Sequence, residues 1–191
     1  SNVKGTFNLM KNCKNAKIKK IIYAASSSCY GIPNKIPTPE DSPIIPRYPY
    51  ALTKSLAEEI LIHFCKLFEI PYVSLRLFNV YGPRARTSGA YGAVMGVFLA
   101  QKLAKKPFTV VGNGKQTRDF TYIDDITDAF VEMLKQRIKN EIFNVGSGGT
   151  YSINYLIELL GGGPTISIPK RPGEPDSTFA EIGRAHVWTP V

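Results

Sequence analysis

A run of consecutive apolar residues, Ile21 to Ala25, limits the fold of this chain more than any other feature. The run is short and has no alternating polar positions, which predicts a β-strand buried on both faces. Serines and a proline-rich loop over residues 31–49 follow it. Similar short strands then alternate with helical patterns, and this alternation predicts a doubly wound α/β fold around a parallel sheet.

The apolar spacing predicts where the other elements lie. Helices are expected over 2–16, 49–68, 94–104 and 152–160, and strands over 72–78, 108–111 and 142–145. Asn2 is expected to cap the first helix. Asp124 or Asp125 is expected to cap a further helix that carries Ile126 and Met133.

The chain carries 24 Lys and Arg residues against 15 Asp and Glu residues, a formal charge of +9. Nucleic-acid binding is one explanation for such an excess. However, the lysines are scattered, several lie near predicted helix ends where they suit the helix dipole, and no aromatic residues are interleaved with them. We therefore expect solvated lysines and no nucleic-acid partner.

The remaining composition is that of an ordinary globular domain, with 43% hydrophobic and 20% charged residues. No apolar run approaches the roughly 20 residues that span a bilayer, and the first residues contain no apolar signal core. Cys13, Cys29 and Cys65 show neither a CxxC nor a metal-ligand spacing, which predicts reduced thiols. We expect a cytoplasmic protein without a membrane partner or a metal site.

Tyr50 and Lys54 form a Tyr-x-x-x-Lys pattern at the start of the helix predicted over 49–68. Residues four apart share one face of a helix, so the ammonium can stabilise the phenolate and lower the pKa of the tyrosine. The tyrosine could then act as a base near neutral pH. A surface tyrosine packed on a lysine stem is the alternative interpretation.

A serine cluster, Ser26 to Ser28, follows the strand predicted at 21–25. Ligands bind at the carboxyl ends of parallel strands, and serine hydroxyls can donate to and accept from a sugar hydroxyl. A serine-rich turn is the alternative. The order strand, serines, loop and Tyr-x-x-x-Lys is more specific than any of its parts.

With these motifs, the chain resembles the extended short-chain dehydrogenase/reductase family, in its nucleotide-sugar epimerase branch. The matching segments extend from Asn2 to about Ala180 and include 2–6, 26–31, 50–54, 76–82, 112–119 and 171–174. The resemblance implies a partial Rossmann-like sheet with NAD as cofactor. It implies Ser26, Tyr50 and Lys54 as catalytic residues, and cofactor contacts from Asn2, Ala24, Ala25, Tyr50, Lys54 and Leu77.

The resemblance also implies a nucleotide-sugar site. Asn79, Arg118 and Arg171 match residues that bind the diphosphate, and Glu174 matches an acid that holds a ribose hydroxyl. An ion pair with Asp119 or Asp124 is the alternative for Arg118. The further residues expected near the substrate are Ser27, Ser28, Ala93, Val94, Thr109, Val111 and Thr178, of which Thr109 and Val111 border the base and Thr178 governs room around the sugar.

The implied reaction is 4-epimerisation of a nucleotide sugar, with a UDP-hexose as the expected substrate. Related dehydratases carry an acidic pair directly after the active-site hydroxyl, and related decarboxylases a glutamate. This chain has Ser27 and Ser28 there, which favours simple epimerisation because serine is a poor unaided acid or base. A 4,6-dehydratase, decarboxylase or reductase, or a non-catalytic sugar-nucleotide-binding protein, remains as an alternative.

The resemblance divides the chain. Residues 1–81 correspond to the C-terminal part of the NAD-binding domain, and 82–180 mainly to the substrate-binding region, with 119–160 partly returning to the first domain. In the family the first strands and the glycine-rich pyrophosphate loop precede the part that matches here, so we expect an inactive fragment of a homodimeric parent, paired through the helices at 2–16 and 49–68. Residues 181–191 resemble a translated sequencing adapter and are expected to be non-native.

Overall fold

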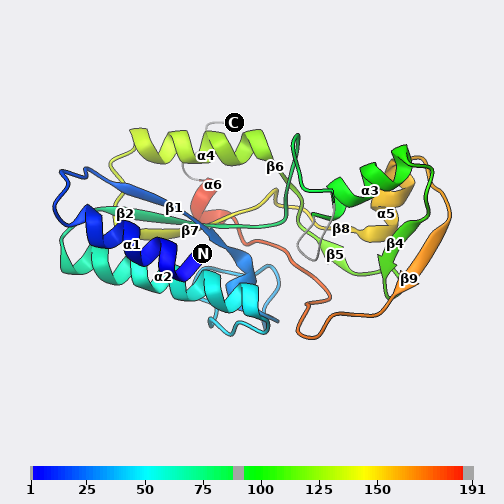
Figure 1. The fold of residues 1–191 in the computed structure, drawn as a ribbon, viewed down its shortest axis with the longest axis horizontal. Helices are drawn as coiled ribbons and strands as arrows, with labels where there is room; N and C mark the ends of the chain where they lie inside the picture. Colours follow the sequence, from blue (N-terminus) through cyan, green and yellow to red (C-terminus); the bar gives the residue numbers. More distant parts are fainter. Residues whose placement is uncertain (1, 88–92, 187–191) are drawn as a thin grey trace.

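The computed structural model describes residues 2–87 and 93–186, with a three-stranded parallel sheet of order β1-β2-β7 (Figure 1). Its strands are β1 (Ile21–Ser26), β2 (Tyr72–Leu77) and β7 (Glu141–Val145). Residues 72–76 of the central strand are all buried, as expected for a strand covered on both faces. The predicted doubly wound α/β architecture is confirmed.

Helices cover both faces of this sheet (Figure 1). α1 (Asn2–Cys13) and α2 (Pro49–Leu67) pack together on one face, and α4 (Ile123–Lys135) lies on the other. The apolar core between α1, α2 and the sheet consists of Met10, Cys13, Leu61, Cys65, Ile70 and Tyr72. The core beneath α4 consists of Val73, Leu75, Met133 and Phe143.

A smaller region lies at the opposite end of the molecule from the start of β1 (Figure 1). It contains α3 (Val94–Leu103), α5 (Ile153–Leu159) and a parallel pair of strands, β4 (Phe108–Val111) and β9 (Thr165–Ile168). Its core consists of Phe98, Phe108, Val110, Ile153, Leu156 and Ile157. This region therefore has an apolar centre of its own, separate from the main sheet.

Short strand pairs connect the two regions. β3 (Val80–Tyr81) pairs with β6 (Thr121–Tyr122) in parallel, and β5 (Thr117–Arg118) pairs with β8 (Tyr151–Ser152) in antiparallel fashion. The remaining elements are the 3-10 turn η1 (Ser27–Tyr30) and the short helix α6 (Gly183–His186).

Both predicted helix caps are wrong. α4 already begins at Ile123, so Asp124 and Asp125 lie inside its first turn and do not cap the helix. Their negative charges interact favourably with the positive end of the helix dipole. Asn2 lies within α1, and its side-chain amide donates to Thr53 Oγ1 on α2 at 3.2 Å. It joins the two helices where a cap was expected.

Cys13, Cys29 and Cys65 are free and buried, as expected for reduced thiols. Burial raises the pKa of the Cys29 thiol to about 12 and that of Cys65 to about 11. Both thiols are therefore protonated and poorly nucleophilic at neutral pH.

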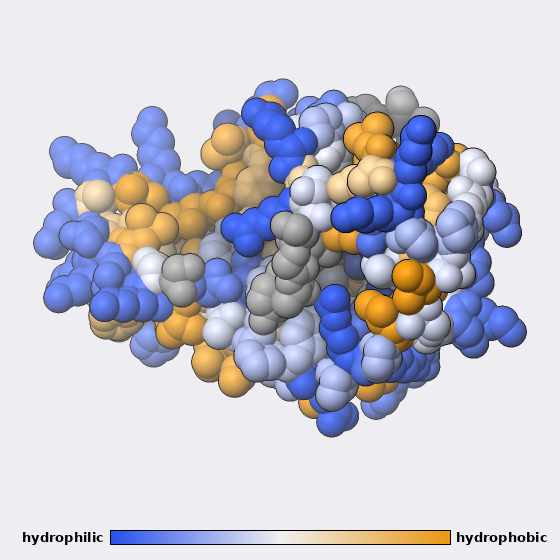
Figure 2. Space-filling model, turned by 45° about the vertical axis from the view of Figure 1, so that its right-hand side comes forward, coloured by the Kyte–Doolittle hydropathy of each residue, from blue (hydrophilic) through white to orange (hydrophobic). Residues whose placement is uncertain are grey.

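On the face drawn in Figure 2, apolar side chains form several separate patches among hydrophilic ones. Within the residues that the structure describes, no helix combines the length and apolarity needed to span a bilayer.

Candidate active site

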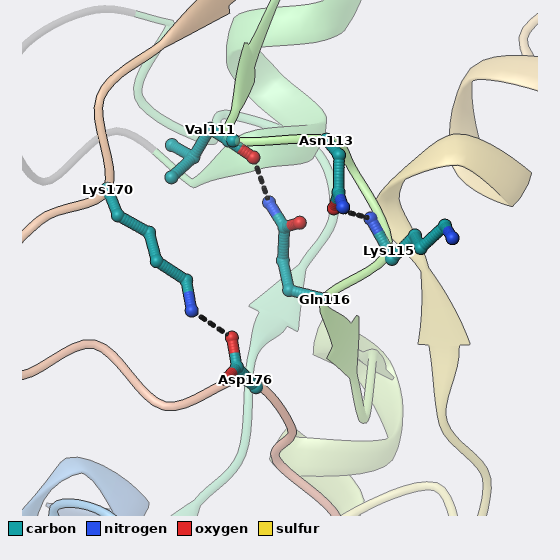
Figure 3. A pocket seen from close by; sticks show the side chains of 7 residues that line it. Val111, Asn113, Lys115, Gln116, Lys170 and Asp176 are labelled. Carbon is teal, nitrogen blue, oxygen red and sulfur yellow. Dashed lines mark hydrogen bonds and ion pairs between the residues drawn. The ribbon is translucent and has the colours of Figure 1, made fainter.

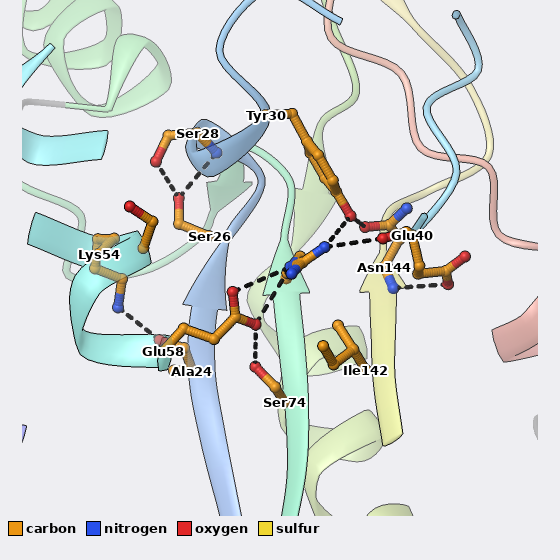
Figure 4. A network of polar contacts seen from close by, with 12 residues as sticks. Ala24, Ser26, Ser28, Tyr30, Glu40, Lys54, Glu58, Ser74, Ile142 and Asn144 are labelled. Carbon is orange, nitrogen blue, oxygen red and sulfur yellow. Dashed lines mark hydrogen bonds and ion pairs between the residues drawn. The ribbon is translucent and has the colours of Figure 1, made fainter. Parts of the chain in front are cut away.

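The serine cluster lies at the carboxyl end of β1. Ser26 ends the strand, opposite Leu77 in the register with β2, and it caps η1 by accepting a hydrogen bond from Ser28 N at 3.3 Å. The hydroxyls of Ser26 and Ser28 are 2.9 Å apart (Figure 4). Ser27 is the half-buried first residue of η1. The turn thus gathers several hydroxyl groups at the strand end.

Tyr50 and Lys54 lie in the first two turns of α2, which Pro49 starts. The Tyr50 side chain is 36% exposed. Lys54 Nζ donates to Ala24 O at 2.6 Å and lies 5.2 Å from the centre of the Tyr23 ring. Burial lowers the pKa of Lys54, and the Glu58 carboxylate opposes this shift. The lysine is therefore fixed against β1 one turn after Tyr50.

The other predicted cofactor residues occupy different environments. Ala24 is exposed beside Lys54, whereas Ala25 is buried in the sheet. Leu77 is half-buried at the end of β2. Asn2 is engaged with Thr53, as described above. Ala24 and Lys54 thus form the accessible part of this set.

The predicted diphosphate residue Arg118 forms an ion pair with Glu174, with Nη2 and Oε1 3.0 Å apart. Neither Asp119 nor Asp124 is its partner, so the pairing weighed from sequence proximity is wrong. Arg118 is 8% exposed, and its Nη1 also donates to Thr117 O at 2.9 Å. Oε2 of Glu174 is buried and accepts no hydrogen bond from the residues described. The pair thus presents one unused buried acceptor.

Asn79 and Thr178 contact each other. The Asn79 amide donates to Thr178 Oγ1 at 2.7 Å and to Asp119 O at 3.1 Å. Because an amide group has two hydrogens, both donors of Asn79 are engaged within the protein. For a direct contact with a diphosphate, the Asn79 side chain would therefore have to rotate. Without rotation, Asn79 would act indirectly by holding the segment that carries Thr178.

Asp119, which the sequence suggested only as an ion-pair partner of Arg118, joins three segments. Its fully buried carboxylate accepts hydrogen bonds from Ser147 N and Oγ at 2.7 and 2.8 Å and from Ala180 N at 3.1 Å. A Cβ on Gly146 would approach Asp119 Oδ2 to 2.5 Å, so glycine is needed there. These contacts fix the segment that carries Glu174 and Thr178 beside Arg118.

The predicted base-binding residues lie on β4 in the smaller region. Val111 borders a cavity of about 450 Å³ that Gly112, Asn113, Lys115, Gln116, Lys170 and Asp176 also line (Figure 3). Gln116 Nε2 donates to Val111 O at 3.0 Å, and Lys170 pairs with Asp176. Thr109 exchanges hydrogen bonds with Gln101 of α3. Most of the residues that line the cavity therefore carry polar or charged side chains.

The remaining predicted substrate residues are less concentrated. Ala93 precedes α3 as its N-terminal cap residue, and Val94 packs against the core of the smaller region. Arg171 is exposed on the segment that leads to Glu174.

Tyr48 is a residue of this site that the sequence motifs did not indicate. Its phenol lies beside the Ser28 side chain, and its charged or ionisable neighbours include Tyr50, Glu174 and Arg118. Burial raises the pKa of Tyr48, so its hydroxyl remains a donor at neutral pH. Tyr48 thus lies between the Ser26–Tyr50–Lys54 group and the Arg118–Glu174 pair. Its position two residues before Tyr50 was the only available signal.

The family model for the NAD dependent epimerase/dehydratase family matches residues 1–146. The chain belongs to this family. A putative UDP-glucose 4-epimerase of Methanocaldococcus jannaschii is 35% identical over 197 residues, covering 99% of this chain and 64% of the relative.

Two solved structures extend the likeness to the fold. The UDP-N-acetylglucosamine 4-epimerase of Methanobrevibacter ruminantium, in complex with UDP-N-acetylmuramic acid, has a TM-score of 0.90 at 30% identity. The UDP-glucuronic acid 4-epimerase of Bacillus cereus, in complex with UDP-glucuronic acid and NAD, has a TM-score of 0.89 at 36% identity. All of this chain aligns with 63% and 62% of these two chains. The chain thus spans less than two thirds of their length.

Proposed function

We propose that the protein containing this chain is a nucleotide-sugar 4-epimerase that acts on a UDP-hexose with NAD. The supporting observation is that Tyr48 lies near two chemically different groups of residues, Ser26–Tyr50–Lys54 and Arg118–Glu174. Ser26, Tyr50 and Lys54 provide hydroxyl and ammonium groups for proton transfer, and Arg118 with Glu174 provides charge and an acceptor for a nucleotide diphosphate. This combination suits a sugar placed between β1 and the 174–178 segment.

The residues at β1 fit the nicotinamide end of NAD. An ammonium has three hydrogens, so the bond from Lys54 to Ala24 O leaves Lys54 able to donate to ribose hydroxyls. Ala24 is exposed next to it, which leaves space for a ring. When bound, NAD supplies the redox chemistry by accepting a hydride from sugar C4 and returning it.

The proposed role of Tyr50 is to remove the proton from the sugar 4-hydroxyl and later give it back. The Lys54 cation stabilises the phenolate form, because an opposite charge favours the ionised group. Ser26, with its hydroxyl 2.9 Å from that of Ser28, orients or relays the same proton. These residues hold and move one proton at the 4-oxygen.

The proposed diphosphate contacts come from Arg118 and Arg171, whose planar guanidinium groups suit phosphate oxygens. Oε2 of Glu174 is a buried acceptor with no donor among the described residues, which is costly unless a ligand supplies one. A ribose hydroxyl is such a donor. The unused acceptor therefore supports a ribose bound beside Arg118.

The serines at positions 27 and 28 favour epimerisation over dehydration or decarboxylation, which need further acids beside the sugar. Product analysis tests this. The protein expressed from its complete reading frame is incubated with UDP-glucose, UDP-N-acetylglucosamine and UDP-glucuronate. A 4-epimer of unchanged mass is expected, whereas loss of water or carbon dioxide would support the alternative reactions. We further propose that the small side chain of Thr178 leaves room for an N-acetyl group on the sugar. Turnover of UDP-glucose but none of UDP-N-acetylglucosamine would contradict this.

Replacing Tyr48 by Phe is expected to weaken UDP-sugar binding about fivefold, since a lost hydrogen bond costs roughly 1 kcal/mol. Isothermal titration with the complete protein measures this. Tyr155→Phe is the matched control, because Tyr155 is an exposed tyrosine of α5. Equal affinity of the two variants for the UDP-sugar would show that the Tyr48 hydroxyl does not contribute to binding.

We also propose that the protein forms a homodimer through α1 and α2. An apolar stripe on α2 is exposed, with Leu52 at 47%, Leu56 at 39% and Leu67 at 62%. Phe7 of α1 is 45% exposed and packs edge-on against Phe64 of α2. It borders a hollow of about 550 Å³ that is also lined by Glu59, Ile60, Ile62, His63, Phe64 and Lys66. Several exposed apolar side chains on two adjoining helices are typical of an interface.

Leu56→Glu is expected to convert this dimer to a monomer, because a charge replaces an apolar contact at its centre. Sedimentation velocity of the complete protein measures the change. Leu103→Glu, at an 86% exposed leucine of α3, should leave the dimer intact. A monomeric wild-type protein, or dimers of both variants, would contradict the proposed interface.

A further inference from the structure

A buried polar network is centred on Arg76 of β2. Figure 4 shows Glu58, Tyr30 and Asn144 of this network in the same view as Lys54 and Ser26. The Arg76 and Glu58 side chains are only 6% and 5% exposed. Arg76 is 3.2 Å from Glu58, and it also donates to a tyrosine hydroxyl and a backbone carbonyl. Burying charges is costly unless they are paired and hydrogen-bonded, so a network of this kind needs explanation.

One arm of the network reaches α2. Arg76 Nε donates to both carboxylate oxygens of Glu58 at 3.2 Å, and Ser74 Oγ donates to Glu58 Oε1 at 2.6 Å. Glu58 lies one helical turn after Lys54 and two turns after Tyr50, on the same face of α2. The Glu58 arm therefore ties the helix that carries Tyr50 and Lys54 to the central strand.

The second arm reaches η1. Arg76 Nη1 donates to Tyr30 Oη at 2.9 Å and to Glu40 O at 3.0 Å. Tyr30 Oη in turn donates to Asn144 Oδ1 at 2.8 Å, and Asn144 N donates to Glu40 Oε1 at 3.0 Å. Tyr30 ends the turn that begins after Ser26. The Tyr30 arm thus holds the serine turn against β2 and β7.

We propose that Arg76 and Glu58 are positioning residues for the candidate catalytic group: the ion pair fixes α2 relative to the Ser26–Tyr30 turn, and Glu58 places a negative charge one helical turn from Lys54. This inference rests on the proposed function for its effect on turnover, but its structural and electrostatic parts can be measured without turnover.

The charge on Glu58 has a definite consequence for Lys54. The titratable groups around this lysine are Glu58 from α2, Tyr23 from β1 and, behind Glu58, Arg76 from β2. Tyr50 lies one helical turn before Lys54 on α2 and near Tyr23. Burial lowers the pKa of Lys54, and Glu58 acts in the opposite direction. Removing the Glu58 charge should therefore lower the pKa of Lys54 further, because the cation loses its nearby anion while Arg76 remains.

The first test is a titration of Lys54 Nζ by NMR in protein labelled with ¹⁵N-lysine, with the signal assigned by Lys54→Arg. Glu58→Gln should lower the pKa of Lys54, whereas Glu58→Asp, which keeps the charge, should leave it close to that of the wild-type protein. An unchanged Lys54 titration in folded Glu58→Gln protein would overturn the electrostatic role.

The second test uses Tyr30→Phe, which removes one hydroxyl from the Tyr30 arm and changes no charge at neutral pH. Because it leaves the buried ion pair intact, this variant can still be measured if Glu58→Gln fails to fold. In the complete protein we expect kcat to fall about tenfold while the affinity for UDP changes less than twofold, because Arg118 and Glu174 lie on other segments. Tyr155→Phe should leave both unchanged. An unaltered kcat in Tyr30→Phe would overturn the positioning role.

The pH–rate profile separates positioning from general destabilisation. In Glu58→Gln the alkaline limb, where Lys54 loses its proton, should move to lower pH, whereas Tyr30→Phe should lower kcat without moving the limb. A merely destabilised protein would lose activity without a shift in either limb. If the wild-type protein lacks turnover altogether, the proposed function fails, while the Lys54 titration still tests the electrostatic inference.

Discussion

Tyr50→Phe is expected to lower kcat about 10²- to 10⁴-fold in the protein expressed from its complete reading frame. The phenol is the only group proposed to take the proton from the sugar 4-hydroxyl, and loss of a general base typically has an effect of this size. Lys54 stays beside Ala24 in this variant, and Arg118 and Glu174 are untouched. The Kd for the UDP-sugar should therefore change less than twofold.

Steady-state kinetics and isothermal titration measure these two quantities. Tyr155→Phe supplies the control for the chemical change itself, since it removes a phenol hydroxyl from an exposed side chain. Activity of Tyr50→Phe within threefold of the wild-type value would show that another residue acts as the base.

Arg76→Met is expected to reduce the free energy of unfolding by about 3–5 kcal/mol, because it leaves the Glu58 carboxylate buried without its cation. The double variant Arg76→Met/Glu58→Met removes both charges and should be more stable than Arg76→Met alone, since no buried charge is left unpaired. Urea unfolding followed by circular dichroism measures all three proteins.

Lys170→Met is the matched control for this comparison. Lys170 forms an ion pair with Asp176, but their side chains are 57% and 78% exposed. Removing one partner of an exposed pair changes stability by roughly 0–1 kcal/mol. A loss of stability in Arg76→Met no larger than that in Lys170→Met would show that burial gives the Arg76–Glu58 pair no special role.

The main strands could be predicted because burial leaves a direct trace in the sequence. β1, β2 and β7 appear as short apolar runs, since a strand covered on both faces tolerates few polar side chains. β3, β5, β6 and β8 have two residues each, which is too short for any periodic pattern. They exist only because other segments pass beside them.

The charged residues of the interior were the hardest to foresee. Glu58 and Arg76 have the residue types of an exposed surface, and only the fold brings Arg76 under α2. The partner of Arg118 was sought among its sequence neighbours, although Glu174 approaches from a distant segment. Tyr48 likewise becomes a candidate site residue only through neighbours that are distant in the sequence, such as Glu174 and Arg118. The catalytic, cofactor-binding and substrate-binding roles remain predictions.

The most direct test of the central claim follows the hydrogen at C4 of the sugar. The protein from the complete reading frame is incubated with UDP-glucose carrying deuterium at C4, and the products are analysed by NMR and mass spectrometry. Transient oxidation at C4 predicts UDP-galactose that retains deuterium at C4, with unchanged mass. Loss of the label to solvent, or a product lacking water, would contradict 4-epimerisation by this route.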